Sequence, residues 1–176
     1  MVVQRVIAGT LYDGVTDVRQ KDKLIEVSDG RIVSVSPIDR ESFEGTQNII
    51  DASNYFVIPG LIDANVHLVS ARTPDTLLEF FTSYHDLVIE AAQIGLKHGV
   101  TSLCDTWGPT EITREVRDRI NARSVVAATI YFGGNILGLK GPLSDDFFPT
   151  GNAFSAATLD EINKCGRRES PETSCR

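Results

Sequence analysis

The sequence predicts an α/β protein in which a small antiparallel β portion precedes parallel strand–helix units. Short strand-like segments separated by turn residues fill residues 1–57, whereas strand and helix patterns alternate over residues 58–160. Such alternation is typical of parallel βαβ units, whose crossovers are right-handed. Residues 161–176 are mostly polar, and we expect a disordered tail there because this segment has too few apolar side chains to form a core.

Three strand-like segments open the chain. They read VVQRVIAG at residues 2–9, DKLIEVSDG at residues 22–30 and RIVSVSP at residues 31–37. The Ser-Asp-Gly sequence at residues 28–30 is typical of a β-hairpin turn. Apolar and polar residues alternate in the third segment, which indicates that one face of that strand is buried. We therefore expect an antiparallel sheet.

A second strand pair is predicted directly after this sheet. The segments QNIIDA at residues 47–52 and YFVIPG at residues 55–60 are strand-like, and Ser53 and Asn54 between them favour a turn. The pattern changes after Pro59-Gly60, so we place the boundary of the β portion at residue 57.

The first strand–helix unit follows this boundary. The short apolar run LIDANVHL at residues 61–68 is suited to a buried parallel strand. A long helix is predicted from Pro74 to about His98, with Thr73 as its N-cap, or as two helices that meet near Ser83.

The alternation continues to the third strand. We expect a strand at residues 100–107, a helix at residues 110–122 and a strand at residues 124–132. The Gly-rich residues 133–152 show little periodicity and are predicted to form a loop. This loop would leave the C-terminal end of the third strand, where the loops of parallel sheets carry substrate contacts.

The composition excludes several classes of protein. The 176 residues are 41% hydrophobic and 23% charged, and no segment approaches the roughly 20 apolar residues of a membrane span. A net charge of −7 and an isoelectric point near 4.9 do not favour nucleic acid binding. The N-terminus lacks the pattern of a secretory signal, and Cys104, Cys165 and Cys175 lack disulfide or zinc spacing. We therefore expect a cytoplasmic protein that contacts neither membrane nor nucleic acid.

Polar residues at the ends of the predicted parallel strands are candidates for a site. Asn65 and His67 are two residues apart on the first strand, so their side chains point to the same side. Asp105 and Trp107 end the second strand, and Asn135 follows the third. We predict substrate contacts for the last three residues. Asp105 capping the next helix, and His67 hydrogen-bonded within a loop, are structural alternatives.

Two phrases of the chain resemble the amidohydrolase superfamily. VIPGLIDANVHL, at residues 57–68, is similar to the first-strand signature P-G-x-x-D-x-H-x-H, and GLKHGVTSLCDTW, at residues 95–107, is similar to G-x-T-x-x-x-D of the second strand. The resemblance covers about residues 1–160 and is greatest to the imidazolonepropionase and prolidase-like branch. It implies part of a β-sandwich at residues 1–57 and an incomplete, TIM-like (β/α) barrel at residues 58–160, with the first three or four βα units.

The resemblance also implies a chemistry. Family members hydrolyse non-peptide carbon–nitrogen bonds of cyclic or linear amides with a divalent metal, zinc in the full-length family, and an aspartate of a later strand as general base. The signature places His67 as a metal ligand and Asn65 where a second histidine is usual. An asparagine amide is a weak oxygen donor, so Asn65 is a weaker ligand or a substrate contact.

The length of the chain is short for this activity. A closed (β/α)₈ barrel takes about 250 residues, but only 116 of the 176 residues follow Gly60. His85 and His98 fall in the predicted helix and cannot replace the ligands of later strands. We therefore expect a truncated chain that is inactive alone and self-associates through uncovered strands. The alternative is a non-catalytic protein that keeps the fold and binds a ligand or a partner.

Overall fold

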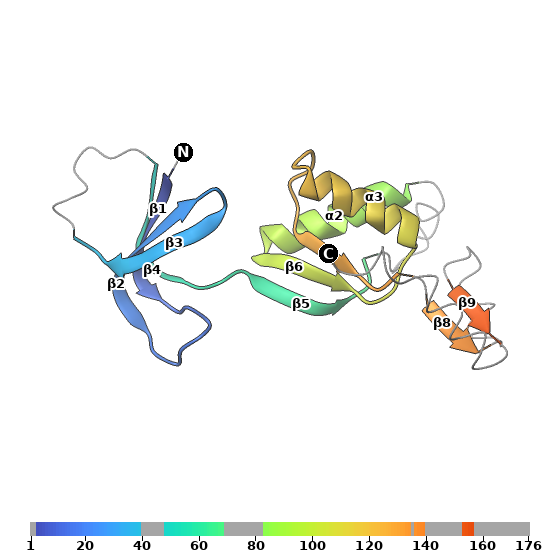
Figure 1. Cartoon of the computed structure of the whole chain (residues 1–176), viewed down its shortest axis with the longest axis horizontal. Helices are drawn as coiled ribbons and strands as arrows, with labels where there is room; N and C mark the ends of the chain where they lie inside the picture. The colour runs from blue at the N-terminus through green and yellow to red at the C-terminus, as the bar shows by residue number, and fades with distance from the viewer. Residues whose placement is uncertain (1–2, 40–47, 69–82, 135, 140–152, 157–176) are drawn as a thin grey trace. The chain divides into compact units, whose positions relative to one another are not determined.

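A computed structural model describes residues 3–39, 48–68, 83–134, 136–139 and 153–156 of the chain (Figure 1). Over these ranges the protein is a mixed α/β structure with nine strands and two helices. The chain divides into two compact units, Met1–Pro59 and Gly60–Arg176, and each unit is described separately below.

The first unit contains a four-stranded mixed sheet in the order β3-β2-β1-β4. Its strands are β1 (Val3–Leu11), β2 (Gln20–Ser28), β3 (Arg31–Pro37) and β4 (Ile49–Val57). The first three strands pair antiparallel, and β4 pairs parallel with β1. The predicted antiparallel sheet is therefore confirmed for three strands, whereas the fourth strand runs parallel to its neighbour β1.

The turn between β2 and β3 is the predicted hairpin. Ser28 pairs with Arg31, so Asp29 and Gly30 alone form the turn. Both turn residues have positive φ, 51° and 75° respectively. Two-residue turns of type I′ need positive φ at both central positions, which explains why aspartate and glycine occur here.

The structure corrects the predicted strand pair at residues 47–52 and 55–60. A single strand, β4, replaces it, and Ser53 and Asn54 lie inside this strand. At this point Gly9 of β1 alone stands opposite three residues of β4, which therefore bulges. A Cβ atom at position 9 would overlap the Ser53 backbone, so glycine is required for this close approach. The residues that favour a turn are thus accommodated in a bulge.

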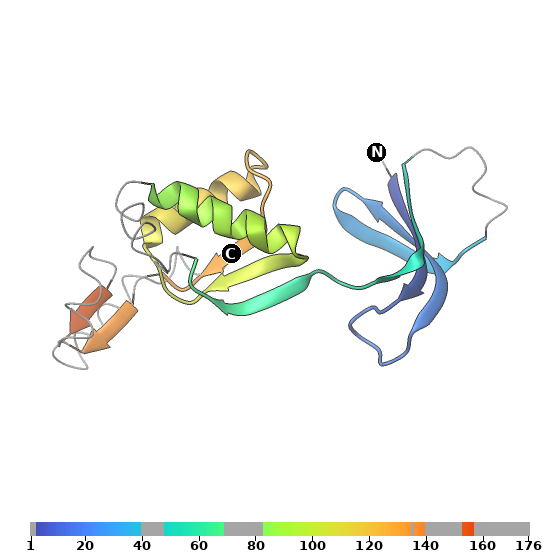
Figure 2. The same cartoon turned by 180° about the vertical axis from the view of Figure 1, so that it is seen from behind.

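The second unit contains a three-stranded parallel sheet in the order β5-β6-β7. Its elements are β5 (Leu61–Val66), α2 (Tyr84–Lys97), β6 (Val100–Asp105), α3 (Thr110–Asn121) and β7 (Thr129–Phe132). Both helices cover the same face of the sheet, as the two opposite views show (Figures 1 and 2). The predicted alternation of strands and helices is confirmed. Within the described residues, neither helix is long and apolar enough to cross a membrane.

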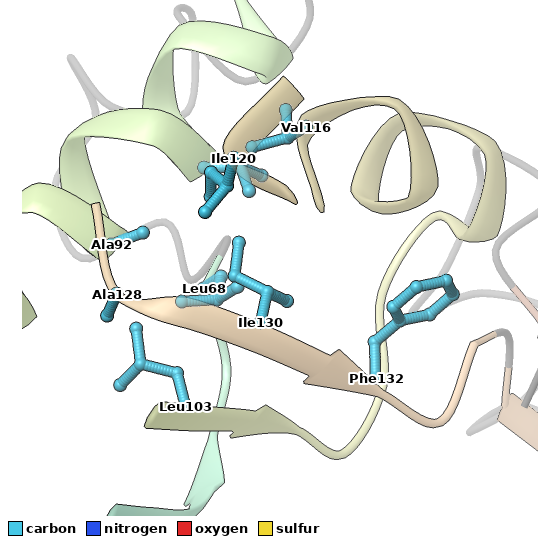
Figure 3. Close-up of a cluster of buried hydrophobic side chains, with 9 residues drawn as sticks. Leu68, Ala92, Leu103, Val116, Ile120, Ala128, Ile130 and Phe132 are labelled. Carbon is cyan, nitrogen blue, oxygen red and sulfur yellow. The ribbon is translucent and has the colours of Figure 1, made fainter. Parts of the chain in front are cut away.

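An apolar core joins the two helices to this sheet (Figure 3). The buried side chains come from α2, β6, α3 and β7 and from residues next to β5 and β7: Leu68, Val88, Ala92, Leu103, Val116, Ile120, Ala128, Ile130 and Phe132. Along β7, Ile130 and Phe132 are buried while Tyr131 between them is 46% exposed. This alternation identifies one face of β7 as covered by α2 and α3, whereas no helix of the described residues covers the other face, which we call the helix-free face.

The start of one element in the second unit agrees with one of its two predicted alternatives, and the start of another differs from its prediction. Helix α2 begins after Ser83, and the earlier part of the predicted helix, at residues 73–82, lies outside the described residues. The third strand was predicted over residues 124–132 but begins only at Thr129. The chain first turns sharply after α3, where Arg123 has a positive φ of 58° and the Ser124 hydroxyl donates to the Arg119 carbonyl at 2.9 Å.

The prediction of a loop over residues 133–152 is wrong in part. Ile136–Leu139 forms β8, which pairs in parallel with β9 (Ala153–Ala156). The run Ile-Leu-Gly-Leu is apolar but too short to show a period, so the sequence pattern could not reveal its strand partner. Residues 135 and 140–152 of the predicted loop lie outside the described residues. The predicted tail at residues 161–176 also lies outside them.

Truncation of a core side chain tests this packing. Ile130 is 1% exposed in the core of the second unit, so Ile130→Ala should lower the free energy of unfolding by about 2–5 kcal/mol because it leaves a cavity. Val126 is 77% exposed, and Val126→Ala should change this free energy by less than about 0.5 kcal/mol. Urea unfolding followed by circular dichroism measures both. Equal losses for the two variants would contradict the packing.

Candidate functional site

The C-terminal ends of the three parallel strands are tied together by backbone hydrogen bonds. The Thr106 N–H donates to the Val66 carbonyl at 3.1 Å, which joins β5 to β6. The Gly133 N–H donates to the Asp105 carbonyl at 2.8 Å, which joins β6 to β7. Ligand-binding residues of parallel sheets gather at this edge. The side chains that follow the strand ends are therefore held close to one another.

A bulge in β5 determines where Asn65 points. Between the pairs Asp63–Leu103 and Val66–Asp105, two residues of β5 stand opposite one residue of β6. The Asn65 N–H donates to the Asp63 carboxylate at 3.2 Å within this bulge. Leu103 and Asp105 are buried on the face that the helices cover, whereas Asn65 is exposed. The additional residue therefore directs Asn65 to the helix-free face of the sheet.

One hydroxyl group contacts both residues that were predicted as metal ligands. Thr106 Oγ1 donates to Asn65 Oδ1 at 2.9 Å and lies 3.4 Å from His67 Nδ1. The imidazole of His67 also packs against the indole of Trp107, with ring centroids 5.1 Å apart and planes inclined by 42°. We call Asn65, His67, Thr106 and Trp107 the strand-end cluster. It combines residues at the C-terminal ends of β5 and β6, which are about 40 positions apart in the sequence.

Asp105 is a buried carboxyl group beside the strand-end cluster. It is 1% exposed and lies on the helix-covered face of β6. Burial raises the pKa of this carboxyl from near 3.8 to about 7, although the backbone N–H groups of Leu68 and Trp107 oppose the shift. Among the described residues, no group makes a hydrogen bond of standard geometry to either carboxylate oxygen. The two N–H groups therefore act on Asp105 as nearby dipoles and compensate its burial only in part.

Residues of both helices enclose Asp105. A Cβ atom at Gly108 would lie 2.8 Å from Asp105 Oδ2 and 3.5 Å from Thr113 Oγ1, so a larger residue at this position would require the Asp105 carboxyl to shift. Thr113 of α3 is fully buried. Burial and the charge of Asp105 both raise the pKa of the Tyr84 hydroxyl on α2. Asp105 thus lies buried in the core, on the face of β6 that the helices cover.

The predicted site residues fall in three places. Asn65, His67 and Trp107 belong to the strand-end cluster, Asp105 lies behind it on the covered face, and Asn135 is outside the described residues. Whether any of them contacts a metal or a substrate stays a prediction.

The other two histidines take part in helix contacts, as the sequence predicted. His85 Nε2 lies 2.7 Å from Glu115 Oε2 and links α2 to α3. His98 caps the C-terminus of α2, where its Nδ1 lies 2.8 Å from the Ile94 carbonyl oxygen. Neither of these contacts brings an imidazole to the strand-end cluster.

Sequence reasoning missed Thr106 and the bulge. Thr106 stands between two predicted site residues, Asp105 and Trp107, and its position at a strand end was a signal that could have identified it. The bulge has no such signal, because a register shift between β5 and β6 is a property of the pairing of two strands. Without it, Asn65 would not reach the Thr106 hydroxyl.

The strand-end cluster does not by itself fit a metal ion. Structural and catalytic zinc sites use three or four nitrogen, sulfur or oxygen ligands. Within the described part of the chain, no group of three or more His, Cys, Asp or Glu side chains could hold a metal. His67 is the single imidazole of the cluster, and the Asn65 oxygen already accepts the Thr106 hydroxyl. Further ligands would have to come from elsewhere.

The fold and the cluster define an α/β protein with polar residues gathered where parallel strands end, and the comparisons with known proteins agree with this class. No family model matches the chain. Among curated proteins, adenine deaminase 1 of Latilactobacillus sakei subsp. sakei (strain 23K) is 30% identical over 96 residues, which cover 52% of this chain and 15% of that protein.

Several solved structures are similar to this chain over most of its length. Molinate hydrolase is 31% identical with a TM-score of 0.71, covering 93% of this chain and 36% of that one. Phenylurea hydrolase B is 29% identical with a TM-score of 0.70, covering 93% and 37%. An amidohydrolase and a prolidase, each 20% identical, share the fold. The chain fits the amidohydrolase superfamily, as its signature predicted, and spans little more than a third of the first two solved relatives.

The buried carboxyl of Asp105 should make stability depend on pH. Its pKa in the folded chain, about 7, is above the value near 3.8 expected after unfolding. The folded state therefore holds a proton that the unfolded state releases as the pH rises between these values, so the free energy of unfolding should fall over this range. The full shift corresponds to a loss on the order of 4 kcal/mol above pH 7.

Asp105→Asn tests this effect because it removes the charge at nearly constant shape. The variant should be more stable than the wild type at pH 8, and the difference should disappear below about pH 4. Asp17→Asn, which changes an exposed turn residue, is the matched control. Urea unfolding of the three proteins at each pH measures the effect. A constant difference between wild type and Asp105→Asn at all pH values would show that Asp105 does not titrate in this way.

Proposed function

We propose that the chain carries the first strands of a metal-dependent amidohydrolase that cleaves non-peptide carbon–nitrogen bonds in cyclic or linear amides. In this proposal residues 58–160 supply the first three or four βα units of a TIM-like barrel, and residues 1–57 supply part of a β-sandwich. The remaining strands would provide the other metal ligands and the general base. The chain alone would then be inactive.

One observation carries this proposal. His67 lies at the C-terminal end of β5 in the strand-end cluster, and the Thr106 and Trp107 side chains of the next strand end contact its ring. In barrel enzymes the residues that act on the substrate come from this end of several strands. The position of His67 agrees with its place in the family signature and supports its assignment as a metal ligand, zinc being the metal proposed.

The names of the relatives support a small-molecule substrate with a carbon–nitrogen bond. One relative is named as an adenine deaminase and another as a phenylurea hydrolase. This chain spans 15% of the adenine deaminase and 37% of the phenylurea hydrolase, so we assign a related activity to it only as a proposal. We propose an amide or urea substrate on this ground, in the cytoplasm, with no nucleic acid or membrane as partner.

A non-catalytic binding protein is the second candidate function. The small number of possible metal ligands favours it. The strand-end cluster holds one imidazole, and its asparagine oxygen is already hydrogen-bonded. In this alternative the polar cluster and the helix-free face would hold a ligand or a partner without chemistry.

Zinc titration separates these candidates. Trp107 is the single tryptophan of the chain and lies beside His67, so its fluorescence reports on events at this imidazole. We expect added zinc to change the emission of the wild type, and His67→Gln to weaken this response by about tenfold or more because the one imidazole ligand is lost. His98→Gln, which changes a helix-end histidine, should respond as the wild type does.

Metal content and turnover complete this test. The purified chain should hold less than about 0.1 equivalent of transition metal, because a site with one imidazole binds it weakly. It should not hydrolyse a phenylurea or a lactam. A wild type whose Trp107 emission does not respond to zinc would leave only the binding function, and a zinc response that survives in His67→Gln would contradict the role of His67.

We also propose that the chain self-associates through the helix-free face of the parallel sheet. Ile62 of β5 is 70% exposed and Tyr131 of β7 is 46% exposed, and the pairing register places both on this face. Exposed apolar groups on an uncovered sheet favour association.

A charge on this face tests the proposal. Ile62→Lys should shift the chain toward the monomer in sedimentation velocity experiments, because a buried lysine at the interface would lose its hydration. Val126→Lys adds the same charge at a residue that is 77% exposed and precedes β7. This control should associate like the wild type. A wild type that stays monomeric at all concentrations would contradict the proposal.

A further inference from the structure

We propose that Asn65 and Thr106 hold His67 in one tautomer, with the proton on Nδ1, and so leave Nε2 as its basic nitrogen. In this role Asn65 is a positioning residue that acts through Thr106 and not a metal ligand. The proposal follows from the number of protons available in the strand-end cluster.

The Thr106 hydroxyl has a single proton to donate. Its Oγ1 lies 2.9 Å from Asn65 Oδ1, an oxygen that can only accept a hydrogen bond. The hydroxyl proton is therefore used toward Asn65. The second neighbour of Oγ1 is His67 Nδ1, at 3.4 Å. With the hydroxyl proton committed, this contact is a hydrogen bond only when Nδ1 carries a proton and donates it to the hydroxyl lone pair.

The ring of His67 is also held on its face. The Trp107 indole lies 5.1 Å from the imidazole, centroid to centroid, at an angle of 42°. Aromatic pairs at such separations prefer a defined mutual orientation. This contact opposes a rotation of the imidazole that would carry Nδ1 away from Thr106. The two neighbours together select both the orientation of the ring and its tautomer.

The consequence is a basic nitrogen that the described residues leave without a hydrogen bond. A neutral imidazole with its proton on Nδ1 carries its lone pair on Nε2, where it can accept a proton or bind an electron-pair acceptor. The use of Nε2 in catalysis rests on the function proposed above, but the tautomer does not. Asparagine at position 65, where the family signature has a histidine, would then serve to accept the hydrogen bond from the Thr106 hydroxyl.

The three histidines of the chain allow a direct measurement. Two-bond ¹H–¹⁵N correlation spectra distinguish the tautomers of each neutral imidazole at about pH 8.5, well above the usual histidine pKa. His98 is an internal reference for a proton on Nδ1, because this atom lies 2.8 Å from a carbonyl oxygen that can only accept. His85 is the reference for a proton on Nε2, which lies 2.7 Å from the Glu115 carboxylate.

Four substitutions of exposed residues then test where the Thr106 hydroxyl proton and the His67 ring proton lie. In the wild type the His67 pattern should match that of His98. Thr106→Val removes the acceptor for Nδ1, and Asn65→Ala frees the hydroxyl proton to donate to Nδ1, so both variants should shift His67 toward the His85 pattern. Thr106→Ser keeps the hydroxyl and Asn65→Asp keeps an oxygen acceptor, so both should retain the wild-type pattern. The signals of His85 and His98 should stay unchanged in all four.

Two results would overturn the inference. The first is a wild-type His67 with its proton mainly on Nε2, and the second is a Thr106→Val or Asn65→Ala variant that keeps the proton on Nδ1. Because the spectra need neither metal nor turnover, their outcome is independent of the zinc titration. A tautomer as proposed with no response to zinc would retain the inference and reject the metal-dependent function.

Discussion

The burial of one face of the parallel sheet is the constraint on which the second unit depends. Helices α2 and α3 cover that face, and Leu103, Ile130 and Phe132 of β6 and β7 fill the space beneath them. Because side chains alternate along a strand, filling this core also decides which residues remain on the other face. The register of β6 against β5 then determines where the polar residues of the family signature point.

The strand-end cluster is a consequence of that register together with one irregularity. Leu103 and Asp105 occupy the covered face of β6, so Thr106 emerges on the other side at the strand end. The bulge in β5 brings Asn65 to the same side, within 2.9 Å of the Thr106 hydroxyl. A local departure from ideal pairing thus assembles the cluster. Bulges are common beside functional sites for this reason.

Asp105 connects the core to the cluster. Its carboxyl is buried among Gly108, Thr113 and the two helices, yet the N–H groups that oppose its pKa shift belong to Leu68 and Trp107, which adjoin or belong to the cluster. A residue that sequence analysis assigns to substrate binding therefore lies in the core behind the cluster.

The sequence by itself determined the order of strands and helices from β5 to β7 and the strand ends at which polar residues gather. The hairpin at Asp29-Gly30, the helix that contains His85 and the family signature around His67 are all encoded by residues adjacent in the chain. Short-range patterns of this kind reflect local backbone preferences and the periodicity of burial, so they can be recognised without a structure.

Tertiary structure alone decided the features that depend on the pairing of distant segments. The turn expected at Ser53-Asn54 became a bulge because Gly9 of β1 allows the Ser53 backbone to approach closely. Likewise, the position of Asn65 and the contact of Thr106 with His67 depend on how β5 pairs with β6. A shift of one residue in strand register reverses the face of every side chain, and this register is set by packing in three dimensions.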